Sequence, residues 1–512
     1  MKYFLLLMAI ICFSCSAKHN GAAIDELETW LGENTNNYSY CVIMPGAGCE
    51  GCIMEGERFA QEYSGRSDIL FVFTRIVSLK LLKTKLGERV IKHNNVLLDT
   101  ENKFAEIDKG QNNIYPVVCF LKNNKVLDLY YLSPDQKQDI IGNLKKELDT
   151  KASITIDLAA YLKENTNKEI MLSKLVDSLE YVPLNTPHDL PVDILMSVKM
   201  SSDNIFVLDR QQNLFRFDRK GNFLNLIGGR GEGDKEYISV VNFEVDEQVG
   251  RVHLFDIYRK KIKTYDMAGN YHGEVPVPLG IENIALLNES CFIGYKPWYS
   301  VDDKMNQCVI LDKQGKEINT IPFTRKQTDK EVEINLFRMP DFNHILSTSR
   351  FCLPFDNTIY FYSGNDKVNK DVQFELGKYL LPLECSMNVE LYNQSLNSPY
   401  VFELNSCRMD NMVYISFFYQ KKSYRLVYDV IQKTFYTAFV GSSPQGVAND
   451  LDGGANFWPL WFTSDKLIGM MTADMLDMEY EDVRVKDLYE RLKKCDNPVL
   501  QIGSCLNDVQ NH

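Results

Sequence analysis

Asp203-Asn-Ile-Phe-Val-Leu-Asp209 and Leu214-Phe-Arg-Phe-Asp218 form the stretch of sequence that decides the fold. The same two patterns are repeated at Gly250-Arg-Val-His-Leu-Phe-Asp256 and Lys261-Ile-Lys-Thr-Tyr-Asp266. Asp209 and Asp256, at the ends of the two equivalent segments, lie 47 residues apart. Each phrase is a short run of apolar and β-branched residues ending in aspartate, a pattern typical of strands that end in tight turns. The chain therefore contains a repeat built from short strands.

Glycine-containing turns follow the repeated strands, at Arg219-Lys-Gly-Asn222 and Met267-Ala-Gly-Asn270. A degraded third copy reads Cys308-Val-Ile-Leu-Asp312 and continues into Lys313-Gln-Gly-Lys316. Weaker strand patterns occupy residues 357–362, 412–418, 424–428 and 466–471. A repeat of about 40–50 residues with four short strands is typical of a β-propeller, whose blades bury their faces only against their neighbours.

Residues 175–512 are the predicted propeller. They resemble the six-bladed, NHL-like propellers of Bacteroidetes lipoproteins, because Gly228–Tyr237 looks like their glycine-rich inter-blade loop and Asp496–Leu500 looks like their closing strand. The resemblance implies that a strand at Ser178–Leu184 pairs with the closing strand and locks the ring. It favours six blades of roughly 56 residues, whereas seven blades of roughly 48 residues remain open on length alone.

Cys49-Glu-Gly-Cys52 lies between a predicted buried strand, Tyr38–Met44, and a stretch of helix-forming residues, Ile53–Tyr63. Further strands are predicted at residues 69–74, 95–99, 117–121 and 126–132, and helices at 78–86 and from Ser133, with Pro134 in the first turn, to about Leu148. Proline suits the first turn of a helix because it lacks an N–H group. Residues 22–150 are therefore predicted to form a small α/β domain.

This order of elements resembles the thioredoxin superfamily, with the cysteine pair at a helix start and Pro116 before the penultimate strand. The resemblance implies that Pro116 is cis and lies against the disulfide, that Cys49 is the attacking thiol and that Cys52 is the resolving thiol. A helix N-terminus stabilises a thiolate through its free N–H groups and its dipole, which makes the thiolate available for attack. If the domain is an enzyme, we expect a thiol–disulfide oxidoreductase.

The cysteine pair departs from the thioredoxin pattern in two respects. Gly48 stands where an aromatic residue is familiar, and Glu50, Glu55 and Glu57 flank the pair with charges that oppose thiolate formation. A fixed structural disulfide therefore remains an alternative to redox chemistry. A metal site would need two more ligands, and although Cys41 is near in sequence, no second CxxC or pair of histidines completes a zinc set.

The first residues are predicted to be a secretory signal covering residues 1–14, with Met1-Lys2 followed by the apolar stretch Tyr3–Phe13. Ser14-Cys15 resembles the lipobox of bacterial lipoproteins, which implies that Cys15 is lipidated and that residues 15–21 tether the chain to a membrane. The alternative is a cleaved signal with an incidental cysteine. Because no acidic cluster follows Cys15, we favour the periplasmic side of the cell envelope over the cell surface.

Residues 151–174 lie between the two predicted domains. They are predicted to be a connector with a short helix near 157–163.

Once Cys12 and Cys15 are set aside, eleven of the 13 cysteines remain, an odd number that excludes a complete intrachain disulfide framework. We expect Cys291, Cys308, Cys352 and Cys407 to be buried free thiols, since they occur in or beside apolar runs.

A net charge of −13 argues against nucleic acid as a partner. The glycine run at 228–233 precedes a strand rather than a helix, so it is not a nucleotide loop, and Asp450-Leu-Asp452-Gly453 lacks the glutamate of a calcium loop, since Trp461 stands there. We expect no cofactor and no metal. The favoured function is a binding protein whose propeller face holds an unknown ligand or protein and whose thioredoxin-like unit acts on, or docks beside, thiol-containing clients. The alternatives are an oxidoreductase whose propeller selects clients and a non-enzymatic scaffold.

Overall fold

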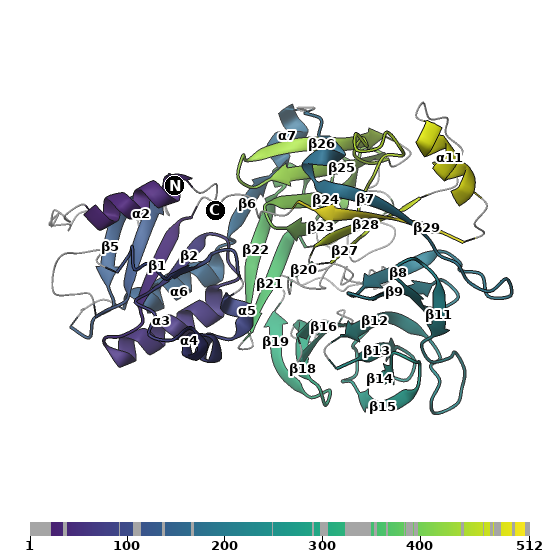
Figure 1. Cartoon of the computed structure of the whole chain (residues 1–512), viewed down its shortest axis with the longest axis horizontal. Coiled ribbons are helices and arrows are strands. Elements are labelled where there is room, and N and C mark those ends of the chain that lie inside the picture. Colours follow the sequence, from purple (N-terminus) through teal and green to yellow (C-terminus); the bar gives the residue numbers. More distant parts are fainter. Residues whose placement is uncertain are drawn as a thin grey trace. The chain divides into compact units, whose positions relative to one another are not determined.

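A computed structural model gives the arrangement of the chain (Figure 1). It describes residues 22–33, 38–91, 93–105, 114–135, 139–164, 168–247, 249–288, 291–296, 306–322, 350–352, 356–364, 367–382, 385, 393, 398–441, 445–463, 465–471, 475, 483–493 and 497–506. The predicted signal, the tether and Cys15 lie outside these residues. The chain divides into two compact units, residues 1–148 and 149–512, and each is described by itself. No helix among the described residues is both long and apolar enough to span a membrane.

The first unit is a five-stranded sheet in the order β3-β2-β1-β4-β5, with helices on both faces. β1 and β2 pair in parallel, as do β2 and β3, whereas β4 runs antiparallel to β1 and β5 antiparallel to β4. The strands are β1 (Tyr40–Pro45), β2 (Ile69–Thr74), β3 (Val96–Asp99), β4 (Val117–Lys122) and β5 (Lys125–Tyr131). The helices are α2 (Ala22–Glu33), α3 (Glu50–Tyr63), α4 (Leu79–Leu86), α5 (Glu88–Ile91) and α6 (Ile140–Thr150).

Two hydrophobic cores lie on opposite faces of this sheet. Every residue of β1 and of β2 is buried, as expected for nearly continuous apolar strands covered on both sides. Phe59 of α3 and Leu144 of α6 pack on one face together with Val42. Leu27 and Leu31 of α2 pack on the other face. The helix that carries the cysteine pair therefore shares its face with α6, and α2 covers the reverse side.

The helices of this unit differ in part from the sequence predictions, since α5 was not predicted and two others depart from them. The last helix was predicted to begin at Ser133, but α6 begins at Ile140, because Asp139 accepts a hydrogen bond from the N–H of Gly142 at 2.7 Å and forms the cap. Ser133 and Pro134 lie in the connection before it, so Pro134 is not in the first turn. Helix α2 was not predicted, although Leu27 and Leu31 are fully buried.

The second unit is a six-bladed β-propeller, which confirms the favoured blade number. The first three blades contain β8 (Leu195–Met200), β9 (Asn204–Asp209), β10 (Leu214–Asp218), β11 (Phe223–Leu226), β12 (Val240–Asp246), β13 (Arg251–Asp256), β14 (Lys261–Asp266), β15 (Tyr271–Pro276), β16 (Asn283–Asn288), β17 (Cys291–Tyr295), β18 (Asn306–Asp312) and β19 (Glu317–Pro322). The other three contain β20 (Arg350–Cys352), β21 (Thr358–Gly364), β22 (Lys367–Glu375), β6 (Ile154–Asp157), β23 (Phe402–Met409), β24 (Met412–Tyr419), β25 (Lys422–Asp429), β26 (Thr434–Gly441), β27 (Trp461–Phe462), β28 (Lys466–Met471), β29 (Val499–Cys505) and β7 (Val176–Pro183).

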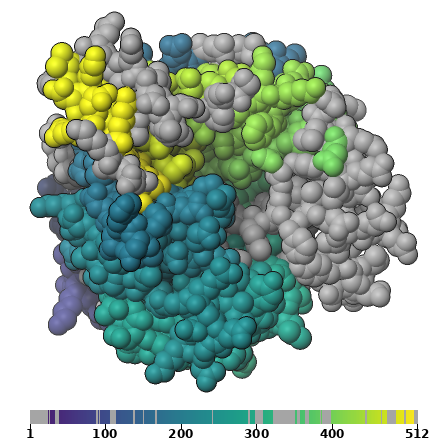
Figure 2. Space-filling model, turned by 90° about the vertical axis from the view of Figure 1, so that its right-hand side faces the viewer, coloured from purple at the N-terminus to yellow at the C-terminus, as the bar shows by residue number. Residues whose placement is uncertain are grey.

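The ring closes by pairing the two ends of the propeller. β29 runs antiparallel to β7, with Leu500 opposite Val182, so the sixth blade combines strands from both ends, as the resemblance implied. In the space-filling view the colours run around the unit and meet where yellow C-terminal residues lie beside teal ones (Figure 2). Leu500, Val182 and Phe215 belong to one buried cluster, which joins the sixth blade to the first.

The predicted connector is part of the propeller rather than a linker. β6 pairs in parallel with β22 and completes the fourth blade, with Ile156 opposite Phe374. The next element, α7 (Leu158–Glu164), packs on the fifth blade, where the hydroxyl groups of Tyr161 and Thr437 lie 2.9 Å apart. Residues 154–183 therefore run across the fourth, fifth and sixth blades. β6 pairs with a strand that lies more than 200 residues later in the chain.

The repeated turns have a common geometry and a common packing role. Asp218 and Asp266 each accept hydrogen bonds from the backbone N–H groups two and four residues later, at 2.8 to 2.9 Å. Gly269 has φ +86°, and a Cβ atom there would collide with the carbonyl oxygen of Leu226 in the preceding blade. Gly221 and Gly315 make the same approach to Pro183 and Pro276. Glycine is therefore needed both for the backbone conformation and for close contact between blades.

Shortening a side chain in the buried cluster that joins the sixth blade to the first should destabilise the propeller. Leu500 is fully buried, so Leu500→Ala is expected to lower the free energy of unfolding by about 2–5 kcal/mol, measured by urea denaturation of the propeller. Leu224→Ala on β11 is the matched control: this side chain is 45% exposed, and the expected change stays within about 0.5 kcal/mol. Equal effects of the two substitutions would contradict a closure that depends on this core.

Candidate functional site

The two cysteines of the CxxC sequence lie together at the start of α3, as predicted. Cys49 is the N-cap residue, Cys52 lies in the first turn, and the two form a disulfide with their Cα atoms 5.4 Å apart. Cys49 is partly exposed, whereas Cys52 is only 8% exposed. An approaching thiol therefore meets Cys49 first, beside the free N–H groups of the helix start.

The segment before β4 lies against the cysteine pair. The backbone N–H of Cys49 donates a hydrogen bond to the carbonyl oxygen of Ile114 at 2.9 Å. Gly48 has φ +155°, and a Cβ atom there would collide with the same carbonyl group. The close approach of the two chains explains why glycine stands where the thioredoxin pattern has an aromatic residue.

Pro116 lies on the α3 side of the sheet, directly before β4. Its Cβ atom would be 3.7 Å from a Cβ atom placed on Gly56, and its carbonyl oxygen accepts a hydrogen bond from the N–H of Leu132 at 2.8 Å. The described residues contain no cis peptide bond, so the cis isomer implied by the resemblance is wrong for this structure. X–Pro bonds are trans unless local packing compels the cis isomer, and here the contact with the Cys49 backbone is made by Ile114 instead.

A cavity of about 310 Å³ adjoins the disulfide. Helix α3 contributes Cys49, Cys52 and Glu55 to its lining. The connection from β5 into α6 contributes residues 132–134 and 139–141. Both sulfur-bearing residues therefore border a space large enough to receive a side chain of a second molecule.

The other described cysteines are free thiols. Cys291, Cys308, Cys352 and Cys407 are buried, which confirms the expectation for all four. Cys41 and Cys119 lie opposite each other on β1 and β4, a pairing that was not predicted. Burial raises the pKa of the Cys119 thiol to about 12, and burial together with Cys119 raises that of Cys41. Since the thiolate is the nucleophile, these two thiols are much less reactive than an exposed cysteine.

No group of three or more histidine, cysteine or acidic residues in the described part of the chain is placed to hold a metal ion. The acidic stretch at 450–452 has a structural role instead. Asp450 accepts hydrogen bonds from the N–H and the hydroxyl group of Ser173, at 2.9 and 2.6 Å. Asp452 accepts one from the hydroxyl of Tyr181 at 3.0 Å. These contacts fix the residues next to and within β7, the strand that closes the ring.

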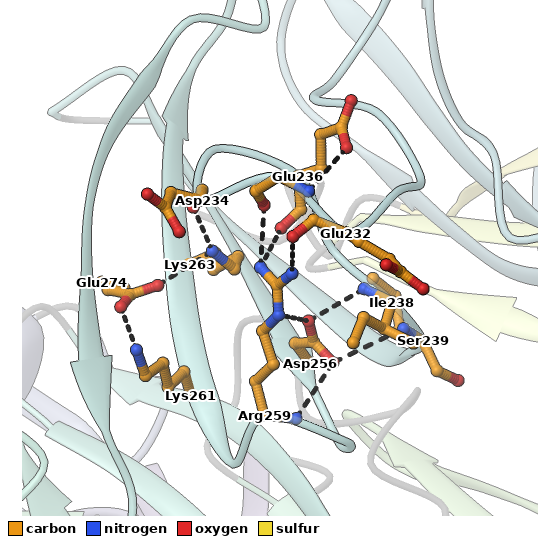
Figure 3. Close-up of polar contacts among 12 residues, drawn as sticks. Glu232, Asp234, Glu236, Ile238, Ser239, Asp256, Arg259, Lys261, Lys263 and Glu274 are labelled. Carbon is orange, nitrogen blue, oxygen red and sulfur yellow. Dashed lines mark hydrogen bonds and ion pairs between the residues drawn. The ribbon is translucent and has the colours of Figure 1, made fainter.

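The glycine-rich loop at 228–237 connects the first blade to the second, and Arg259 holds its backbone in place (Figure 3). The guanidinium group of Arg259 donates to the carbonyl oxygens of Gly233, Glu236 and Glu232, at 2.9, 2.8 and 2.6 Å. Asp256 is fully buried and accepts hydrogen bonds from the N–H groups that follow the loop, from Ile238 at 2.9 Å. The loop is thus an ordered part of the propeller, and it lies between two blades as the resemblance implied.

Two lysines and one glutamate support the same loop from β14 and β15 (Figure 3). The buried Lys263 ammonium donates to the carbonyl oxygen of Asp234 at 2.7 Å and to Glu274 at 2.8 Å, and Lys261 also pairs with Glu274. Burial raises the pKa of Glu274, but the hydrogen bonds from Lys261 and Lys263 outweigh it and lower the pKa to about 2. The exposed side chains of residues 232 and 234 are therefore presented to solvent on a fixed backbone.

Buried charges also join the inner strands of the blades, and sequence reasoning missed them. Lys199 of β8 and Glu244 of β12 form an ion pair at 2.7 Å, with side chains 2% and 4% exposed. Burial lowers the pKa of Lys199 and raises that of Glu244. Their only signal in the sequence is a charged residue inside an otherwise apolar strand. Removing one partner would leave a buried uncompensated charge, so the pair is a structural link between blades.

The fold, the cysteine pair and the glycine-rich loop define a six-bladed propeller protein with a disulfide-bearing α/β unit before the propeller in the sequence. Residues 153–504 match the family described as "Domain of unknown function (DUF4934)", and the chain belongs to that family. The matched region begins at β6, which agrees with the contribution of this strand to the fourth blade. No curated protein matches the sequence.

Solved structures show the shared fold. A protein from Bacteroides fragilis, described as exported, is similar with a TM-score of 0.54 at 17% identity, over 69% of this chain and 99% of that chain. At this identity the likeness establishes the fold alone. A member of the DUF4221 family from Bacteroides vulgatus is less similar, with a TM-score of 0.34 at 10% identity, over 51% of this chain and 84% of that chain.

The role of Arg259 in ordering the glycine-rich loop can be tested by exchange of backbone amides. Arg259→Lys is expected to speed hydrogen–deuterium exchange in residues 231–237, because a lysine ammonium cannot reach three carbonyl groups with a planar fork. Arg210→Lys is the control, since Arg210 pairs with Asp193 at the surface and its side chain is 59% exposed. Unchanged exchange in Arg259→Lys would show that other contacts hold the loop.

Proposed function

We propose that the protein is a binding protein of the bacterial cell envelope whose N-terminal unit carries out thiol–disulfide exchange at Cys49 and Cys52. The observation that carries the proposal is the disulfide at the start of α3, with Cys49 partly exposed beside a cavity of about 310 Å³. The propeller supplies the binding module, since propellers serve as recognition surfaces in many unrelated proteins. Its proposed partner is a ligand or a protein that binds at the propeller face.

The assignment of the N-terminal unit as thioredoxin-like is part of this proposal. It is supported by the sheet order β3-β2-β1-β4-β5, in which the cysteine pair follows the central strand β1 and opens α3. The position of Pro116 before β4, with Ile114 bonded to Cys49, supports it further. The trans bond before Pro116 is the main departure from that superfamily.

The exchange reaction needs only the two sulfurs and a client. In the reduced unit, the Cys49 thiolate attacks a client disulfide, forms a mixed disulfide and releases one client thiolate. The Cys52 thiolate then attacks the Cys49 sulfur, which releases the second client thiolate and leaves the Cys49–Cys52 disulfide. The client gains two electrons, and a dithiol reductant must reduce the pair before the next cycle. Oxidation of a client dithiol is the same sequence in reverse.

A structural disulfide in a non-enzymatic scaffold is the alternative function. Glu50 and Glu55 are exposed in the first two turns of α3, and negative charges near a cysteine oppose ionisation of its thiol. Glu57 contributes less to this effect, because its carboxylate pairs with Lys85 at 3.2 Å. The two functions differ in whether the bond is reduced at the potentials of envelope thiols.

The exchange proposal predicts different behaviour for the two cysteines. With dithiothreitol as reductant, the full mature chain is expected to accelerate insulin reduction, and Cys49→Ser to lower the rate to the background. Reduced Cys52→Ser, mixed with insulin after dithiothreitol has been removed, should instead accumulate a mixed disulfide at Cys49, detected by intact mass, because no resolving thiol is present. Cys385→Ser is the control and should keep the rate of the unsubstituted protein. Equal rates for Cys49→Ser and the unsubstituted protein, or a reduction potential below about −300 mV, would favour the structural disulfide.

Attachment to the envelope is proposed from the sequence around Cys15. We infer that Cys15 becomes lipidated after removal of residues 1–14 and that the chain faces the periplasm. Growth with an alkyne-labelled fatty acid should label the full chain, and Cys15→Ala should abolish the label while Cys12→Ala retains it. A label that survives Cys15→Ala would place the modification elsewhere.

A further inference from the structure

We propose that the cavity beside the disulfide selects clients with a lysine or arginine next to the reactive cysteine. This inference rests on the proposed thiol–disulfide exchange and names its client class. Among the described residues, the charged side chains that line the cavity are Glu55 of α3 and Asp139, which caps α6. Both are exposed carboxylates, so the cavity joins a negative rim to the partly exposed sulfur of Cys49.

The remaining walls complement the stem of a long basic side chain. Leu132, Ile140 and Ile141 line the cavity and are buried. Lysine and arginine place an aliphatic stem along apolar surface while the charged end meets a polar group. An apolar wall with carboxylates at its edge therefore fits a basic side chain better than an acidic or a purely apolar one.

Neighbouring cations do not neutralise this rim in the described part of the chain. Lys85 pairs with Glu57 at 3.2 Å and Lys145 pairs with Glu62 at 2.8 Å, whereas Glu55 and Asp139 have no ion-pair partner among the described residues. Glu50, which is exposed beside Cys49, adds a charge of the same sign. A surface of one sign raises the encounter rate of partners that carry the opposite sign.

The same carboxylates link the ionisation of the cysteine pair to the charge of the client. Carboxylates close to a cysteine oppose ionisation of its thiol, because like charges repel. A client cation within about 4–6 Å of the sulfur offsets this effect and favours the thiolate. A basic client thus supplies the positive charge that the cysteine pair lacks, whereas an acidic client adds to the repulsion.

Matched peptide disulfides test this selectivity on the full mature chain. The probes are two ten-residue peptides of one sequence with an internal disulfide, carrying either two lysines or two glutamates beside the cysteines. The reduced protein is mixed with each peptide, and the second-order rate constant of peptide reduction is followed by chromatography. We expect the lysine peptide to react about tenfold faster at low salt and the difference to shrink in 1 M salt, where the screening length is only about 3 Å.

Charge-neutral variants identify the residues responsible. Glu55→Gln combined with Asp139→Asn should reduce the tenfold preference to about twofold, and asparagine retains the capping of α6. Asp25→Asn on α2 is the control for loss of surface charge: it removes one exposed negative charge on the opposite face of the sheet, against two in the double variant, and should keep the preference. Circular dichroism confirms that each variant is folded.

The outcomes separate the two levels of the proposal. Equal reduction of both peptides, or a preference unchanged in the double variant, would overturn the client selectivity while leaving thiol–disulfide exchange in place. Reduction of neither peptide beyond the background would overturn the exchange activity itself.

Discussion

The pairing of β7 with β29 is the contact on which the propeller depends. A blade buries its faces only against its neighbours, so an open ring would leave the first and the sixth blades each with an exposed apolar face. Leu500 and Val182 fill this junction and are buried with residues of the first blade. The segment that supplies β7 also supplies β6 to the fourth blade and α7 to the fifth. One stretch of thirty residues, 154–183, therefore ties together half of the ring.

Local patterns in the sequence were sufficient to predict much of this architecture. The alternating strands that end at Asp209 and Asp256, with glycine turns at fixed positions, indicated the propeller, since strand and turn are both encoded within a few residues. The same holds for the cysteine pair at a helix start, which needs only a buried strand, a breaker and helix-forming residues in succession. The closing strands were also placed, although the predicted boundaries of β29 began three residues too early.

The features that escaped prediction depend on contacts between distant parts of the chain. β6 has the residues of a connector, and only its pairing with β22 makes it a strand. The order of strands in the sheet likewise places Ile114 against Cys49 and brings Cys41 on β1 opposite Cys119 on β4. Buried charges such as Lys199 and Glu244 contradict the apolar pattern of their strands, and nothing local announces the partner that compensates each of them. The trans bond before Pro116 shows that a resemblance can place a residue correctly and still fail on its conformation.

β29 is among the last strands to be synthesised, and this affects how the protein folds. β7 is synthesised more than 300 residues before its partner, so its edge stays unpaired until almost the whole chain has emerged. Contacts of such high sequence separation fold slowly, and open strand edges invite association with other chains. The N-terminal unit is formed by the first 148 residues and has no such delay. During synthesis the disulfide-bearing unit can thus fold while the ring is still open.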